Sequence, residues 1–421
     1  MMTRQNPLTL ITPVSTELLI PLTARLLQIR QEIETGTRQP FEDLDTIHYA
    51  RWIILHPKDI DYTYPSSPGV RLVFSSDFDG DIQSHLSQLA EKCPAFIDQI
   101  YSCCEGYPDP DTRTFTSRLE YLSRWQVAST AFFAGAPGRS LNQIRLESGL
   151  RNYIWKFLQG NKWSNQTSSQ VFQAIQREIS SHPEFQWATK KIKTPKLNLL
   201  GLAILGLVML IMLPVILPWI LLIRFFHESK DPPLGLLPSQ VDESHLRELE
   251  EYEDLHNQNQ FTQILVMKPG RVRLITLLSM MNFAKVLIRN LFVHGKLMGI
   301  PTIHFARWVM IDNLKVMVFF SNFDGSWQQY LGDFIDKSGW GLTGIWSNTV
   351  KFPKTRFLFW GGAYDEEHFL AWSRYYQIPT QVWYCAYPHL SIKNIINNSA
   401  IRLGLGKQLN ERQAQAFLNR F

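Results

Sequence analysis

Two segments of this 421-residue chain carry an arginine and an aspartate at matching positions, and these are the residues that could do chemistry. Arg51 and Asp79 form the first pair, and Arg307 and Asp324 form the second. An aspartate can act as an acid or base beside a reacting oxygen, and an arginine can stabilise the charge that develops there. Such a pair suits polarising a peroxide or anchoring a carboxylate. Asp324, Arg307, Asp79 and Arg51 are therefore the candidate catalytic residues.

The same residues also have a structural explanation. Asp324 could cap a helix that begins at Gly325, the glycine would make the turn, and Arg307 would tie down a hairpin. A buried arginine needs a carboxylate or several carbonyl groups around it, whether or not it takes part in a reaction. Both copies keep these residues, and two copies of an active site are seldom both needed. Both interpretations stay open at this point.

Histidine side chains could hold a haem or a metal, but their spacing favours neither. His48 and His304 lie in apolar strands, where a histidine more often bonds within the core, and His389 lies in a loop. None has a second ligand at the spacing of a zinc site, and the four cysteines form no C-x-x-C pair. We take His304 and His389 as candidate cofactor ligands, with haem as the cofactor to test, and expect no metal site.

The two pairs belong to an internal repeat, which is the strongest pattern in the sequence. Thr46–Trp52 and Thr302–Trp308 are identical at six of seven positions, and Pro13 and Pro269 keep the same offset of 256. Two further matches follow in the same order. They pair Ser76–Gly80 with Ser321–Gly325 and, more weakly, Ala131–Gly135 with Phe357–Gly361. The chain is therefore predicted to contain two copies of one domain.

Each copy must supply strands and helices that position these residues. In the second copy, apolar periodicity and turn residues predict the order β-α-β-β-α-β, followed by one more helix and strand. The predicted elements are a strand at 261–267, a helix at 271–293, strands at 303–311 and 315–323, a helix from 325, a strand at 356–360, a helix at 365–375 and a strand at 380–384. This order is the ferredoxin-like unit, an α+β fold, and the first copy fits it with insertions. Because the strands are apolar on both faces, we expect the two copies to pair as an α+β barrel.

The hairpin between two of these strands predicts which side chains share a face. A tight turn at 312–315 places Arg307 opposite Phe320. The clusters expected from this register are Arg307, Asn322 and Asp324 in one copy and Arg51, Asp77 and Asp79 in the other. A one-residue slip in register would instead place Asp324 beside His304.

A charge-free apolar segment separates the two copies. Leu197–Ile223 has 27 residues without a charge, and about 20 suffice for a membrane helix. Lysines crowd its N-terminal flank, so the positive-inside rule places that flank in the cytoplasm. Pro214 and Pro218 would each kink a helix, which leaves a single span or a segment that dips in and returns. Because paired copies must lie on one side, we favour a re-entrant or monotopic segment with both soluble domains facing the cytoplasm.

Composition narrows the class of protein. Apolar residues make up 45% and charged residues only 19%, which suits extra buried or lipid-facing surface. The net charge of +5 is dispersed and excludes a nucleic-acid binder, and we expect no signal peptide. The predicted parts are a first repeat (1–160), a helical linker with a basic flank (161–196), a membrane segment (197–226), a Pro-rich and acidic linker (227–260) and a second repeat with an extra helix and strand (261–421).

Thr302–Lys337 and Arg356–Pro388 resemble a family of uncharacterised bacterial membrane-associated proteins with tandem ferredoxin-like repeats. That resemblance covers most of the second copy and implies no particular activity. At the level of fold, the tandem order is similar to dye-decolourising peroxidases and chlorite dismutases, which bind haem in such barrels. The peroxidases carry a G-x-x-D-G motif whose aspartate works on peroxide. Asp79-Gly80 and Asp324-Gly325 match its last two positions, but serines stand where its first glycine would be.

Two classes of function follow. The first is a non-catalytic membrane adaptor or scaffold that binds an apolar ligand, either lipid or haem, in or beside the barrel. Its partners would be the lipid bilayer and an apolar small molecule, not nucleic acid. The second is a haem-dependent, peroxidase-like oxidoreductase, in which Asp324 is the acid/base and Arg307 stabilises charge. Whether the protein is an enzyme stays open, and the first class is slightly favoured.

Overall fold

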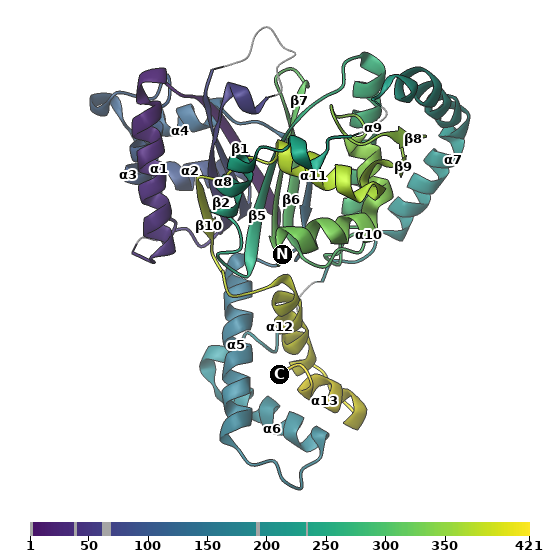
Figure 1. The fold of residues 1–421 in the computed structure, drawn as a ribbon. Coiled ribbons are helices and arrows are strands. Elements are labelled where there is room, and N and C mark those ends of the chain that lie inside the picture. The colour runs from purple at the N-terminus through teal and green to yellow at the C-terminus, as the bar shows by residue number, and fades with distance from the viewer. Residues whose placement is uncertain (1–2, 38–39, 61–68, 191–193, 233–234) are drawn as a thin grey trace.

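Two four-stranded antiparallel sheets form the body of the protein (Figure 1). The computed structural model describes residues 3–37, 40–60, 69–190, 194–232 and 235–421. The first sheet has the strand order β1 (Gln5–Pro13), β3 (Arg71–Asp79), β2 (Ile47–Leu55) and β10 (Val382–Cys385). The second sheet has the order β4 (Ser129–Ala134), β6 (Ile303–Ile311), β7 (Val316–Asp324) and β5 (Gln258–Val266). The fold is therefore α+β, as the sequence predicts.

Each sheet takes three strands from one half of the chain and its fourth strand from the other half. β10, near the C-terminus, pairs with β2 through Val382 and Trp52. β4, from the first half, pairs with β6 through Phe132 and Arg307. The two halves are thus joined by reciprocal strand pairing, and neither sheet is complete without both halves.

The sheets pack on each other through their inner faces. Along β2 the side chains alternate, so that Trp52 faces outward while Arg51 and Ile53 face the other sheet. Ile53 belongs to an apolar cluster that includes Val309 and Val318 from the second sheet. This packing explains why strands apolar on both faces are stable here, because each face has cover.

Helices cover the outer face of each sheet. The first sheet packs against α1 (Leu19–Glu34), α2 (Ile82–Lys92), α3 (Pro94–Tyr101) and α4 (Phe115–Arg124). The second packs against α9 (Arg271–Asn290), α10 (Trp327–Trp346) and α11 (Glu366–Tyr376). The short helix α8 (Glu243–Glu250) precedes β5.

A helical extension projects from the body (Figure 1). It consists of α5 (Leu141–Gly160), α6 (Ser168–Ser181), α12 (Ile392–Leu405) and α13 (Glu411–Leu418). These helices share their own apolar core, in which Ile154 and Ile175 meet Ile401 and Phe417. The extension thus also combines elements from both halves of the chain.

Two of the sequence matches pair residues that do not occupy equivalent positions in the structure. The predicted strand at 356–360 is replaced by the short strands β8 (Thr355–Arg356) and β9 (Trp360–Gly361), which pair only with each other. The counterpart of β4 is β10, because Phe132 faces Arg307 as Trp383 faces Arg51. The weak match of 131–135 to 357–361 was therefore wrong.

The proline match also fails. Pro13 ends β1 opposite Arg71, and the equivalent end of β5 is Val266, opposite Val316. Pro269 lies three residues further on, outside the ladder. The equal spacing of the two prolines is a coincidence of loop lengths.

Candidate polar sites and the apolar helix

Arg307 crosses from its own sheet to the facing one. Its guanidinium forms an ion pair with Asp77 of β3, with an Nη2–Oδ1 distance of 3.1 Å. It also donates to the carbonyl of Leu8, at 2.6 Å, and to the Thr9 hydroxyl, at 3.3 Å. All these partners belong to the first half of the chain.

Arg51 makes the reciprocal crossing. Its guanidinium donates to the Phe261 carbonyl, at 2.9 Å, and to the Thr262 hydroxyl, at 3.0 Å. It also donates to the Ser321 carbonyl, at 2.8 Å, and to Oδ1 of Asn322. The Asn322 amide in turn donates to Asp77 Oδ2 at 3.0 Å, which closes the network.

These contacts correct the expected grouping. The sequence predicts one cluster within each copy, whereas a single cluster of Arg51, Arg307, Asp77 and Asn322 joins the two sheets. It holds two guanidinium groups and one carboxylate, all at most 3% exposed. Burial lowers the pKa of Arg51 to about 9 and raises the pKa of Asp77, although Arg307 opposes the rise in Asp77. Its hydrogen bonds run between the sheets, so the arrangement serves to hold them together.

Asp79 and Asp324 lie apart from this cluster and act in parallel ways. Asp79 bonds His48 Nε2, at 3.1 Å, and accepts from the backbone N–H of Leu141, at 2.7 Å. Asp324 bonds His304 Nε2, at 2.8 Å, and accepts from the backbone N–H of Ile392, also at 2.8 Å. Each aspartate therefore ties a strand histidine to the first residue of α5 or α12.

A β-bulge explains how Asp324 reaches His304. Arg307 lies opposite Phe320, which confirms the register expected from the hairpin. Between Phe305 and Ile303 the ladder shifts by one residue, and this places His304 beside Asp324. The predicted helix cap was wrong, because Ser326 caps α10 instead.

The candidate cofactor ligands do not fit a haem centred on Asp324 and Arg307. Both carboxylate oxygens of Asp324 are already bonded, and Arg307 faces Asp77 instead. The His304 ring packs against Tyr49, with a centroid distance of 5.5 Å, and His389 lies exposed in the loop after β10. The described residues also bring no three His, Cys, Asp or Glu side chains together as metal ligands.

The apolar segment is one continuous helix, α7 (Leu199–Leu222), which passes through Pro214 and Pro218 and ends in a π-turn at Ile223–His227. The reversal expected of a re-entrant segment does not occur. This helix is long and apolar enough to cross a membrane, and its most apolar window is entirely unburied.

Both ends of α7 are fixed to α9. At its start, the Asn198 amide donates to Asn290 Oδ1 at 2.8 Å. Near its end, the Trp219 indole donates to the Thr276 hydroxyl at 2.9 Å. Because Asn290 ends α9 and Thr276 lies in its first half, the two helices run antiparallel, side by side.

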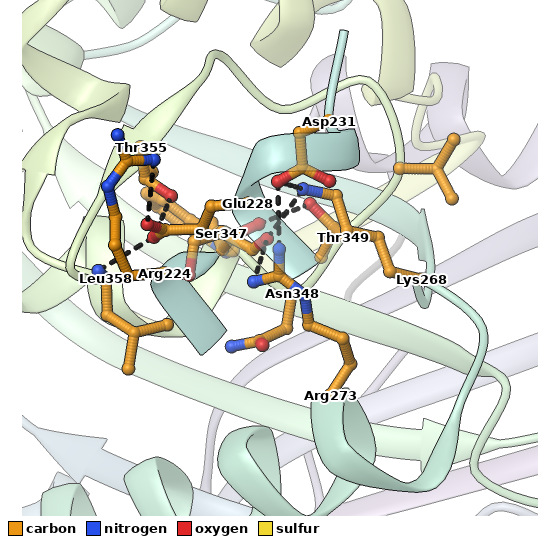
Figure 2. A network of polar contacts seen from close by, with 12 residues as sticks. Arg224, Glu228, Asp231, Lys268, Arg273, Ser347, Asn348, Thr349, Thr355 and Leu358 are labelled. Carbon is orange, nitrogen blue, oxygen red and sulfur yellow. Dashed lines mark hydrogen bonds and ion pairs between the residues drawn. The ribbon is translucent and has the colours of Figure 1, made fainter. Parts of the chain in front are cut away.

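Beyond the π-turn, a buried carboxylate fastens the chain to the body (Figure 2). Glu228 is fully buried and accepts from the Thr355 hydroxyl, at 2.7 Å, and from the N–H groups of Phe357 and Leu358, both at 2.8 Å. Phe357 and Leu358 have φ values of 52° and 68°. Successive residues in this left-handed conformation turn their N–H groups to one side and bind an anion between them.

A second carboxylate completes the junction. Asp231 accepts from Lys268 Nζ and from Arg273 Nη2, both at 2.8 Å, and Lys268 also donates to the Ser347 carbonyl, at 2.9 Å (Figure 2). Sequence reasoning missed Glu228 and Asp231 as functional residues, because beside an apolar segment they looked like ordinary flanking charges. A fully buried glutamate next to an exposed apolar helix is not an ordinary flanking charge, since it needs specific partners.

The junction predicts a pH effect on stability. Burial lowers the pKa of Lys268 to about 8 from 10.5, so between these values the unfolded chain binds the proton more tightly. The contribution of Lys268 to stability is therefore lowest below about pH 8 and rises with pH up to about 10.5. Melting curves in detergent, near the two ends of this window, should show wild type gaining stability relative to Lys268→Met as pH rises. A difference independent of pH would contradict this assignment.

No family model, curated protein or solved structure matches this chain.

Proposed function

We propose that this protein is a membrane-attached, non-catalytic scaffold, with its rigid two-sheet body held on one membrane face by α7. The observation that carries the proposal is that α7 is exposed and apolar along its length while both its ends are bonded to the body. Exposed apolar surface on this scale marks a contact with lipid or another apolar partner. The apolar ligand of the scaffold is then the lipid itself.

The strand pairing supports a monotopic attachment. Each sheet contains strands that come before α7 in the chain and strands that come after it. The body therefore lies on one side of a bilayer, and a helix with both ends on that body cannot cross to the other side. Phe225, Phe226 and Trp360, each more than 60% exposed, extend the apolar surface beyond the end of α7. The lysines before α7 favour the cytoplasmic side.

The repeated polar residues fit a structural role in a duplicated ferredoxin-like barrel. Phe78 stacks on His85 with a centroid distance of 3.8 Å, and Phe323 stacks on Tyr330 at the same distance. Ser76 bonds His85 as Ser321 bonds Tyr330. Such matching contacts are what a tandem duplication leaves behind. They support a scaffold, because these repeated side chains bond to other groups within the protein.

Charges placed on the outer face of α7 test the attachment. Leu207 and Ile211 are 57% and 65% exposed and lie one turn apart. Replacing both with aspartate should cost about 5 kcal/mol in the apolar phase, which is more than a thousandfold in membrane partition. Liposome flotation should show the wild type at the top of the gradient and the double variant at the bottom.

The matched control puts the same change on another surface. Ile20 and Leu27 on α1 are 82% and 49% exposed, and replacing both with aspartate should leave flotation unchanged. The proposal fails if the α7 variant still floats, or if the α1 variant also leaves the membrane. A Soret band after adding haemin, abolished in His304→Ala, would replace the scaffold with the peroxidase-like alternative.

A further inference from the structure

An open groove of about 530 Å³, lined by both polar and apolar side chains, lies between α5 and α12, beneath the loop that follows β10. Arg145, Ser148 and Asn152 line it from successive turns of α5, and Asn394 and Asn398 line it from successive turns of α12. Neither of the pairs that tie the helices to the sheets, His48–Asp79 and His304–Asp324, lines this groove. α5 and α12 project from a different side of the body than α7 (Figure 1).

The loop over the groove is held in a fixed shape. The side-chain amide of Gln258 donates to the carbonyls of Tyr387 and Leu390, at 3.0 and 2.7 Å. The Tyr387 hydroxyl bonds His48 Nδ1 at 3.1 Å. A wall fixed in this way keeps the groove open without a ligand, so binding does not have to order it.

The ionisable side chains known to line the groove are mainly basic. Arg145, Arg151 and His389 line it, and none of the described residues that line it is acidic. Arg145 forms a surface ion pair with Asp45, at 3.3 Å, and also interacts with the Tyr384 side chain; exposed ion pairs contribute little. Within the described part of the chain, the buried Nε of Arg151 has no hydrogen-bond partner. Arg145 and Arg151 therefore bring two guanidinium groups to one groove, and no described lining residue supplies a carboxylate beside them.

The floor of the groove adds hydrogen-bonding groups. Asn398 is only 2% exposed, yet its Oδ1 has no partner among the described residues. Asn394 uses Oδ1 to accept from the Ser391 backbone and hydroxyl, which leaves its NH₂ as a donor. An unpaired buried polar atom costs free energy, and a ligand that bonds to it recovers that cost.

We propose that this groove binds a small phosphate ester that also carries hydroxyl groups. The phosphate would lie between Arg145 and Arg151, because a guanidinium donates two parallel N–H groups to phosphate oxygens. A ligand hydroxyl would donate to Asn398 Oδ1. The inference does not depend on the scaffold function, since the groove and α7 share no residue.

Calorimetric titration in neutral detergent tests this proposal with glycerol 3-phosphate, inorganic phosphate and glycerol. Glycerol 3-phosphate should bind more tightly than inorganic phosphate, and glycerol should give no heat. Arg151→Gln should weaken binding about 10- to 100-fold, the loss expected for a charged hydrogen bond. Arg145→Gln should also weaken it, whereas Arg412→Gln, an exposed change on α13, should not.

Melting temperatures separate loss of the site from loss of the fold. Arg151 has no described partner to lose, so its glutamine variant should melt like wild type. Equal affinity in wild type and both groove variants would overturn the proposal, as would the absence of any heat. Binding to nanodiscs that contain phosphatidylglycerol, without binding of free glycerol 3-phosphate, would overturn the assignment to a soluble ligand.

Discussion

Replacing Asp77 with alanine should lower the free energy of unfolding by about 3–5 kcal/mol, because it removes the only carboxylate of the cluster between the sheets. Arg307 would lose its ion pair, and Asn322 would lose its acceptor. Two guanidinium groups would then remain buried without a counter-charge. Denaturant titration in detergent, followed by tryptophan fluorescence, would measure the loss.

Asp81→Ala provides the matched control. Asp81 is an exposed residue that caps α2 through the Ser84 N–H, so its loss should lower the free energy of unfolding far less than the loss of Asp77. If both alanine variants lose the same stability, the cluster does not stabilise the sandwich. Replacing Asp77 and both arginines together with apolar residues of similar size should recover much of the loss, since it removes the buried charges as well as their attraction.

Replacing Glu228 with alanine should free the segment around Phe357 and Leu358. Three donors would lose their acceptor, and each buried unsatisfied group costs about 1–3 kcal/mol. Two left-handed, non-glycine residues would also lose the anion that holds them, and such conformations cost about 1–3 kcal/mol each. We expect faster hydrogen exchange in 355–361 and a lower melting temperature.

The control for Glu228 is Glu243→Ala. The Glu243 side chain is 86% exposed, so its loss should change neither the exchange of 355–361 nor the melting temperature. Unchanged exchange in Glu228→Ala would mean that the junction does not depend on this carboxylate. If exchange rises while flotation is unchanged, Glu228 fixes the body to α7 rather than α7 to the membrane.

The sequence could predict what depends on neighbours along the chain. The hairpin at 312–315 set the register correctly, because a short turn leaves few choices of pairing. The alternation of side chains along β2 and β6 correctly predicted the face of the strand on which Arg51 and Arg307 lie. The alternative of a one-residue slip did name Asp324 as the neighbour of His304, but the bulge that confines the slip to the end of β6 leaves no mark on the apolar pattern and could not be predicted.

Contacts between segments that lie far apart in the chain could not be predicted from the sequence. Arg51 and Asn322 meet across two sheets, and nothing near either residue indicates the other. The strands β4 and β10 are short, and their sequences would suit pairing with any apolar sheet edge. The sequence therefore could not predict that each strand joins the sheet formed by the other half of the chain. Glu228 was missed for a similar reason, because its three hydrogen-bond donors, Thr355, Phe357 and Leu358, lie more than 120 positions away.

The exchange of fourth strands also governs how the protein is made. β2 leaves the ribosome long before its edge partner β10, because more than 300 residues separate the two strands in the chain. Until then the first sheet has an open edge, which is a template for wrong pairing with other chains. α7 is synthesised during this interval, so under the proposed attachment the nascent chain would reach the bilayer before its body can close. The proposed attachment would thus couple membrane delivery to completion of the fold, and a chain cut short before residue 382 would leave the first sheet one strand short.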